Sequence, residues 1–407
     1  MKRLFFTLLF LFCLTLAGCA VHQPEAPEIV PKKQDSAAQE AEPKYLPETA
    51  PEPEADKTAP EAPDIHEILS GMTLEQKVGQ LFFVRCPEQD VEEKIERCCL
   101  GGLLLFGRDY KDANGNWLTK EAFTAKLESY QEAAQASTGV PLLIGSDEEG
   151  GTVTRASRNP NLFPEKSKSP QELYASGGIG AVLNDTARKN DRLCELGINV
   201  NFAPVCDVST DPKDFIYARS LGKNAAETMA YVIGVVSVMN DEHVGAVLKH
   251  FPGYGNNVDT HTGIAVDERP IEWFEKSDLM PFEGGIQAGA PFVLVSHNIV
   301  ECMDPEHPAS LSPAVHELLR QRLGFDGVIL TDDLAMEAVK AYAEGGTAAT
   351  EALLSGNDMI VTTDFEEQIA EVLNAVAEGR IEESVIDAAC LRVLTAKLRL
   401  GLLGEQA

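Results

Sequence analysis

An α/β protein built as a single (β/α)8 barrel is the fold that this sequence predicts. From Ile65 onward, apolar runs of strand length alternate with longer amphipathic segments of helix length. The runs span residues 80–85, 102–106, 141–146, 200–205, 246–250, 292–296, 327–331 and 359–362. Strands that read as nearly continuous apolar runs belong to parallel sheets covered on both faces. Eight such units within residues 65–407 suit a closed, TIM-like barrel.

Helix-length segments between the runs support the barrel. The clearest span residues 120–135, 225–240, 313–323 and 365–377. An open doubly wound sheet is the alternative parallel arrangement, but no G-x-G-x-x-G sequence follows the first apolar run. We therefore expect one barrel domain at residues 65–407.

The first residues predict export from the cytoplasm. Lys2 and Arg3 precede an apolar run at residues 4–16, which is too short to span a bilayer as a mature helix. Small residues then precede Cys19, and this box resembles the cleavage site of a bacterial lipoprotein, with residues 1–18 as signal peptide and Cys19 as the lipidated residue. An ordinary secretory signal with an incidental cysteine is the alternative. Either reading places the protein outside the cytoplasm.

Residues 19–64 are rich in Pro, Glu, Ala and Lys and hold few large apolar side chains. Such a segment cannot bury enough surface to offset the entropy of ordering, so we expect a disordered tether. The anchored protein would then lie at the outer membrane or at the outer face of the cytoplasmic membrane.

Charge and cysteine content exclude several classes of protein. The formal net charge of -30 argues against nucleic acid as a partner, because phosphates require Lys and Arg. Seven cysteines without regular spacing lie beyond Cys19, and they read as buried thiols rather than as a disulfide framework or a zinc site.

Ionisable residues follow five of the predicted strands, at the ends where a barrel of this kind carries its active site. They are Asp147, Asp207, Lys249, His250, His297, Asp332 and Asp333. A single charged residue after a strand can be a helix cap, but caps alone do not explain five such strand ends.

Three segments carry the chemistry. They are Ser146 to Arg155, with the sequence SDEEGGTVTR; Lys249 to Gly255, KHFPGYG, followed by DTH at residues 259–261; and Leu330 to Met336, LTDDLAM. In this order and at these strand ends they resemble glycoside hydrolase family 3, in its β-N-acetylhexosaminidase branch. The resemblance covers residues 65–403, the whole predicted barrel.

The resemblance implies a catalytic pair. Asp332 would be the nucleophile of a retaining glycosidase, and its neighbour Asp333 would cap the following helix. His261 would be the general acid/base, with Asp259 fixing its tautomer and favouring its charged form. A surface histidine in a Gly- and Asn-rich loop is the alternative for His261.

Five further residues match the sugar-binding positions of the family. They are Asp147, Arg155, Arg219, Lys249 and His250. Carboxylates and cations suit hydroxyl recognition. Arg155 and Arg219 could instead be ion-paired surface residues, and His250 could be a buried structural histidine. We expect Glu149 to be structural, and Asp207 and His297 to shape the floor of the site.

Two departures from the family's pattern bear on this reading. Tyr254 stands where the branch often has histidine, so the packing of that loop is expected to differ. The chain also lacks the second α/β domain that supplies a glutamic acid/base in the family's β-glucosidases, which makes the histidine assignment more necessary.

The expected function is release of terminal β-linked N-acetylglucosamine from peptidoglycan fragments (muropeptides) or chitooligosaccharides by a monomer that needs no metal or organic cofactor. Two alternatives remain open. One is a β-N-acetylglucosaminide phosphorylase, since a histidine that has lost its proton repels phosphate less than a glutamate would. The other is a catalytically silent lipoprotein that binds the cell wall.

Overall fold

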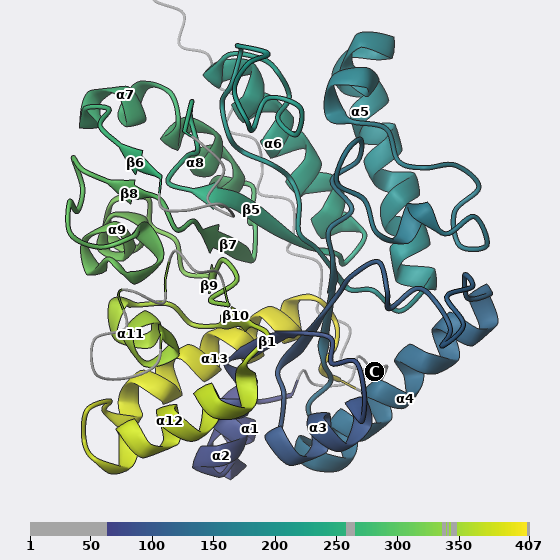
Figure 1. Ribbon diagram of the computed structural model, residues 1–407, viewed down its shortest axis with the longest axis vertical. Helices are drawn as coiled ribbons and strands as arrows, with labels where there is room; N and C mark the ends of the chain where they lie inside the picture. Colours follow the sequence, from purple (N-terminus) through teal and green to yellow (C-terminus); the bar gives the residue numbers. More distant parts are fainter. Residues whose placement is uncertain (1–62, 258–264, 336–338, 340–341, 343–347, 405–407) are drawn as a thin grey trace, which may run out of the picture. The chain divides into compact units, whose positions relative to one another are not determined.

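The computed structural model describes residues 63–257, 265–335, 339, 342 and 348–404 (Figure 1). The predicted signal peptide, Cys19 and nearly all of the tether lie outside the described residues. So do Asp259 and His261. The predictions made for these residues stay predictions.

The central element is a sheet of eight parallel strands. They are β1 (Phe82–Arg85), β2 (Gly102–Leu105), β3 (Leu143–Ser146), β4 (Val200–Asn201), β5 (Gly245–Phe251), β7 (Phe292–Val295), β9 (Val328–Thr331) and β10 (Ile360–Thr362). Their order in the sheet is β10-β1-β2-β3-β4-β5-β7-β9. A parallel bridge between Leu330 and Met359, the residue before β10, joins β9 to β10 and closes the ring. The predicted barrel is confirmed. Seven of the predicted runs contain one of these strands, and β5 extends one residue beyond its predicted run at each end.

Helices lie around the strands in Figure 1. They are α1 (Ile65–Gly71), α2 (Leu74–Gln80), α3 (Val91–Cys98), α4 (Lys120–Thr138), α5 (Pro170–Glu195), α6 (Ala225–Asp241), α7 (Ile271–Lys276), α8 (Leu279–Gln287), α9 (Pro313–Glu317), α11 (Ala348–Ser355), α12 (Phe365–Ala377) and α13 (Glu383–Arg399). The expected helix at 313–323 continues from α9 into a π-helical turn at Leu318–Arg322.

Capping residues explain where several helices begin. The Thr119 hydroxyl accepts a hydrogen bond from the Ala122 N–H at 3.2 Å at the start of α4. The Asn224 side chain does the same for Glu227 at 3.0 Å before α6. Such caps satisfy backbone donors that have no partner inside the helix, so the sequence itself places these starts.

The barrel interior is filled by large apolar side chains. Phe83 and Phe202 meet edge to face, with ring centroids 5.2 Å apart. Gly145 of β3 permits this contact, because a Cβ there would lie 2.6 Å from the Phe202 ring. The interior is therefore a packed core, and the room for a ligand lies above it, at the strand ends.

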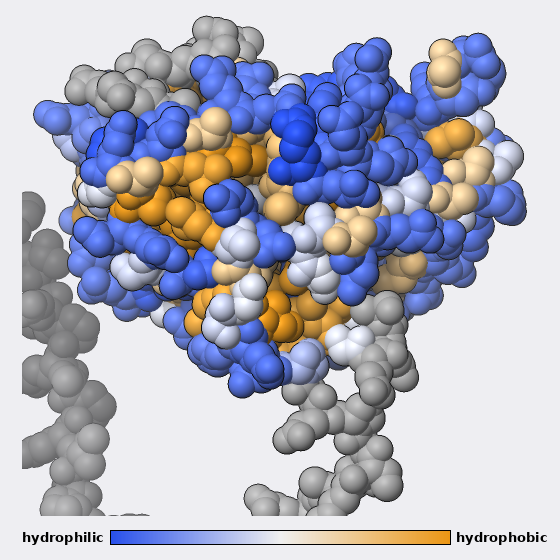
Figure 2. Space-filling model, turned by 90° about the horizontal axis from the view of Figure 1, so that it is seen from below, coloured by the Kyte–Doolittle hydropathy of each residue, from blue (hydrophilic) through white to orange (hydrophobic). Residues whose placement is uncertain are grey.

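Figure 2 shows hydrophilic residues over much of one face, interrupted by hydrophobic areas. The large hydrophobic side chains exposed in the described residues are Ile179, Phe215, Ile233, Val266, Trp273 and Leu354.

No helix in the described part of the chain is long and apolar enough to cross a membrane. The seven cysteines of residues 63–404 are free thiols, four of them buried.

A two-stranded sheet was not predicted. It pairs β6 (Val266–Asp267) with β8 (Ile299–Val300). Each strand has two residues, too few to give an alternating pattern that a sequence reading can detect.

Candidate active site

A pocket of about 290 Å³ opens at the carboxyl ends of the strands. Its lining combines the predicted nucleophile with all five predicted sugar-binding residues, which come from four different strand ends or loops. The lining residues are Arg85, Leu104, Phe106, Asp147, Val153, Arg155, Phe202, Arg219, Lys249, His250, Leu294, Asp332, Asp333 and Val361. The structure thus brings together the predicted site residues that it describes.

Lys249 is the centre of an ion-pair network on one wall. Its Nζ lies 2.9 Å from Asp147 Oδ1 and 2.7 Å from Glu149 Oε1. Arg219 donates to both Glu149 oxygens, at 3.0 and 2.8 Å. The side chains of Lys249 and Glu149 are only 3% and 2% exposed, so this wall is rigid and shielded from solvent. Asp147, at the pocket end of the network, keeps an acceptor within reach of a ligand hydroxyl.

Glu149 supports the network from behind. Burial opposes ionisation of its carboxyl group, but the charges of Lys249 and Arg219 outweigh burial and lower the Glu149 pKa. Glu149 is thus a buried counter-ion of Lys249 and Arg219. Its position also places Arg219 in the pocket wall rather than on the open surface.

His250 is oriented by Asp207. Its Nδ1 lies 2.8 Å from Asp207 Oδ2, and its Nε2 lies 3.1 Å from Arg219 Nη2. A carboxylate at Nδ1 and a guanidinium at Nε2 favour the tautomer with hydrogen on Nδ1. Asp207 also accepts from the Tyr254 backbone N–H at 2.7 Å, so it fixes the start of the loop after β5. The Tyr254 ring packs against His250, with centroids 5.7 Å apart.

Asp332 and Asp333 follow β9 directly. The Asp332 N–H donates to Val295 O of β7 at 3.0 Å, and Asp332 Oδ1 accepts from the Asp333 N–H at 2.9 Å. Asp333 Oδ1 instead accepts from the Ala335 N–H at 3.0 Å, two residues further along the chain, which is the bonding of an Asx turn. Burial raises the Asp333 pKa. His297 lies beneath this pair, with Nε2 3.1 Å from Asp333 O.

Phe106 and Arg85 are among the lining residues that the sequence analysis does not single out. Two guanidinium groups lie near the Phe106 ring, with Arg85 Cζ at 4.3 Å and Arg155 Cζ at 5.2 Å from its centroid. Arg155 also donates to Asp147 Oδ2 at 3.3 Å. The sequence does contain a signal for Arg85. It is an ionisable residue at the end of the first apolar run, and the other candidate residues lie at the ends of later runs.

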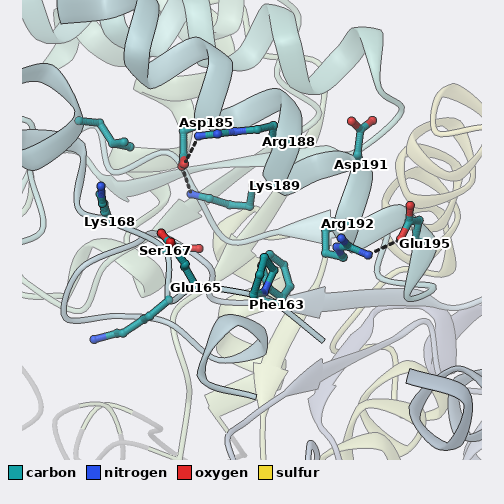
Figure 3. Close-up of a pocket in the computed structure, with 13 residues that line it drawn as sticks. Phe163, Glu165, Ser167, Lys168, Asp185, Arg188, Lys189, Asp191, Arg192 and Glu195 are labelled. Atoms are coloured by element: carbon teal, nitrogen blue, oxygen red, sulfur yellow. Dashed lines mark hydrogen bonds and ion pairs between the residues drawn. The ribbon is translucent and has the colours of Figure 1, made fainter. Parts of the chain in front are cut away.

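A larger pocket, of about 590 Å³, lies between the loop after β3 and helix α5. In Figure 3, Arg188 and Lys189 reach Asp185, and Arg192 reaches Glu195. These charges are satisfied within their own helix, and the pocket contains none of the predicted catalytic or sugar-binding residues. The smaller pocket at the strand ends is therefore the candidate active site.

The region from 63 to 404, with its gaps, shows no group of three or more His, Cys, Asp or Glu side chains able to hold a metal ion. Asp259 and His261 fall in the gap at 258–264, between Asn257 and Ala265.

Residues 73–396 match the N-terminal domain of glycosyl hydrolase family 3, which is well over half of the chain. The chain belongs to glycosyl hydrolase family 3. A protein named beta-hexosaminidase from Xanthomonas campestris pv. campestris is 30% identical over 319 residues, which cover 77% of this chain and 88% of that protein. A beta-hexosaminidase from Nitrosomonas eutropha is 29% identical over 301 residues, with 72% and 81% covered.

Solved structures of this glycosidase family share the fold. A family 3 β-N-acetylglucosaminidase from a Paenibacillus species superposes with a TM-score of 0.73 and 30% identity over 83% of this chain. This chain spans 64% of that longer protein, less than two thirds of its length. A β-N-acetylhexosaminidase from Beutenbergia cavernae gives a TM-score of 0.68 and 30% identity, covering 80% of this chain and 98% of that one.

Proposed function

We propose that this chain is a retaining β-N-acetylhexosaminidase that releases terminal β-linked N-acetylglucosamine. The observation that carries the proposal is the pocket at the strand ends, where Asp332 shares a cavity with the network of Asp147, Lys249 and Arg219. The relatives named beta-hexosaminidase support the same substrate sugar. The network would hold the sugar hydroxyls, which leaves Asp332 to react with the anomeric carbon.

The reaction is a double displacement. Asp332 attacks the anomeric carbon and forms a glycosyl-aspartate, while an acid protonates the departing oxygen. The hydrogen bond from the Asp333 N–H to Asp332 Oδ1 orients the carboxylate before attack. Water then attacks the anomeric carbon, loses its proton to the same acid/base group, and releases the sugar from the Asp332 carboxylate.

His261, assisted by Asp259, is the proposed acid/base. The motif resemblance supports this assignment. So does the pocket lining, because its carboxylates other than Asp332 are Asp147, which is ion-paired with Lys249, and Asp333, which binds the Ala335 N–H. An acid matters most for a poor leaving group. His261→Ala should therefore retain most glycosylation of a dinitrophenyl glycoside and lose it on a disaccharide, with turnover of the activated substrate restored by azide. Equal losses on both substrates and no azide effect would make His261 a binding residue.

The proposal extends to location and substrate. We propose a monomer anchored through Cys19 outside the cytoplasm, which acts on peptidoglycan fragments or chitooligosaccharides. Cys19→Ala should leave catalysis intact and move the enzyme from the detergent phase to the aqueous phase, since stable anchoring depends on the acyl chains. Wild-type protein recovered wholly in the aqueous phase with residues 1–18 attached would contradict the anchor.

The decisive experiment is an assay with an aryl β-N-acetylglucosaminide. Wild type should release free N-acetylglucosamine, and Asp332→Ala should lose several orders of magnitude in turnover because no covalent intermediate forms. Asp333→Asn is the matched control and should lose less. A fluorinated sugar inactivator should label Asp332. Labelling of Asp333 would show that the neighbour is the nucleophile, and sugar 1-phosphate formed in phosphate buffer would indicate a phosphorylase.

A further inference from the structure

Arg85 differs from every other cation in the active-site pocket. Arg155 and Lys249 pair with Asp147, and Arg219 pairs with Glu149. The Arg85 side chain makes no hydrogen bond or ion pair with any residue that the structure describes, and its buried Nε has no partner there. It ends β1 and lines the same cavity as Asp332.

The position of Arg85 is nevertheless well defined. Its guanidinium lies over the Phe106 ring, with Cζ 4.3 Å from the centroid. Stacking on an aromatic face holds the plane of a guanidinium without using any of its five N–H donors. Arg155 lies 5.2 Å from the same ring, but its Nη1 donates to Thr154 O and its Nη2 to Asp147 Oδ2, so it is the ion-paired counterpart of Arg85.

A partly buried guanidinium with unused donors is costly unless something binds it. A planar carboxylate suits it best, because the two groups form parallel charge-assisted hydrogen bonds. The chain's net charge of -30 repels anions at long range, so an anionic substrate would need a local cation inside the pocket. N-Acetylglucosamine itself is neutral and does not require this extra charge.

We propose that Arg85, stacked on Phe106, is a carboxylate subsite that selects substrates bearing an anionic group next to the scissile bond. This inference rests on the proposed function, since it assigns a specificity residue to the same pocket. The carboxylate can come from the leaving group or from a substituent on the sugar, and both sources present the same chemistry to the guanidinium.

The competing role for Arg85 is electrostatic support of the carboxylate pair. Its charge is among the influences that lower the Asp333 pKa, against the larger effect of burial, which raises it. If that were its main role, loss of the charge would affect neutral and anionic substrates equally and would move the acid limb of the pH–rate profile. Selectivity between matched substrates separates the two roles.

The test compares para-carboxyphenyl with para-carbamoylphenyl β-N-acetylglucosaminide, and an N-succinyl with an N-succinamoyl glucosaminide. The ratio of kcat/KM within each pair is measured for wild type, Arg85→Met and Arg85→Lys. Arg85→Met keeps an apolar stem on Phe106 and should lower the anionic-to-neutral ratio about 10- to 100-fold in one pair, the range for a lost charge-assisted hydrogen bond. Arg85→Lys should lower the anionic-to-neutral ratio less than Arg85→Met does, because lysine keeps the positive charge but not the planar paired N–H donors of the guanidinium.

Lys111→Met is the matched control, because Lys111 also lies over a ring, 4.6 Å from the Trp117 centroid, but outside the pocket. Its ratios should equal those of wild type. Ratios unchanged by Arg85→Met in both pairs would overturn the proposal, whatever happens to absolute rates.

Binding of the matching thioglycosides, measured by calorimetry, makes the test independent of turnover. Selective binding of the anionic thioglycoside that Arg85→Met abolishes would support the subsite even if no oxygen glycoside were hydrolysed, in which case only the proposed reaction would fail. Wild-type protein that binds neither member of a pair selectively would refute the subsite.

Discussion

The substitution Lys397→Met should raise the free energy of unfolding at pH 7, but it should leave that free energy unchanged or lower it at pH 10. Lys397 lies in α13 with no exposed surface, and its Nζ donates to Gln80 Oε1 at 2.6 Å. Burial lowers the pKa of its ammonium group from the ordinary 10.5 to about 7. Between pH 7 and pH 10.5, Lys397 is therefore mostly neutral in the folded chain and mostly protonated in the unfolded chain.

The sign and size follow from linkage. Because the unfolded state binds more protons between pH 7 and 10.5, the free energy of unfolding rises with pH across that window. At about 1.4 kcal/mol per pH unit, keeping Lys397 buried costs about 4 kcal/mol at pH 7 and about 1 kcal/mol at pH 10. Lys397→Met removes this cost but leaves Gln80 Oε1 unsatisfied, which costs about 1–3 kcal/mol at any pH. The variant should thus be more stable than wild type at pH 7, by about 1–3 kcal/mol, and equal or less stable at pH 10.

Urea unfolding of both proteins from pH 6 to pH 10 measures this difference. Lys77→Met is the control, because Lys77 of α2 pairs with Asp387 at 2.7 Å and that contact raises its pKa. Its destabilisation should stay constant up to pH 9, since Lys77 is then protonated in both states. A Lys397→Met difference that does not vary with pH would refute the reasoning.

Two further substitutions test the charge of the site and the packing beneath it, and a third, Gly180→Ala, is the control for the second. Lys249→Met leaves Asp147 and Glu149 without their shared cation. It should lower the free energy of chemical unfolding by about 3–5 kcal/mol and abolish most of the activity. A variant as stable as wild type would show that the Lys249 charge does not hold these two carboxylates in place. Gly145→Ala places a Cβ 2.6 and 2.8 Å from two phenylalanine ring atoms and should cost about 1–3 kcal/mol. Gly180→Ala in α5, where the Cβ meets nothing within 4 Å, should be neutral or stabilising.

The fold was predictable because parallel strands buried on both faces leave a strong apolar signal. The ends of the strands were less so. The sequence predicts a strand throughout residues 200–205, but β4 ends at Asn201, and only an isolated parallel bridge between Val205 and Lys249 follows it. Pro204 has no N–H to donate, so it interrupts the ladder between these two points. Pro141 has the same effect at the start of β3, which begins at Leu143.

The partners within the site could not be read from spacing. The sequence placed Lys249 and Arg219 near the sugar, but it did not reveal that Glu149 would bind both cations, because Glu149 and Lys249 are a hundred positions apart and meet only when β3 and β5 lie two strands apart in the ring. The sequence indicates a structural role for Glu149 but not the side chains that it supports, and the structure identifies these as Lys249 and Arg219.

Arg85 illustrates the limit most clearly. The rule that selected Asp147, Lys249 and Asp332, an ionisable residue at the end of a barrel strand, also selects Arg85, yet no motif marks it. Arg85 stands out because its side chain has no hydrogen-bond or ion-pair partner among the described residues. A sequence cannot show this, because the partners of the neighbouring cations are known only from the structure. In this pocket the cost of burying Arg155, Arg219 and Lys249 is offset by ion pairs with carboxylates. Arg85 has no such pair among the described residues, so the cost of burying it depends most on the ligand that binds.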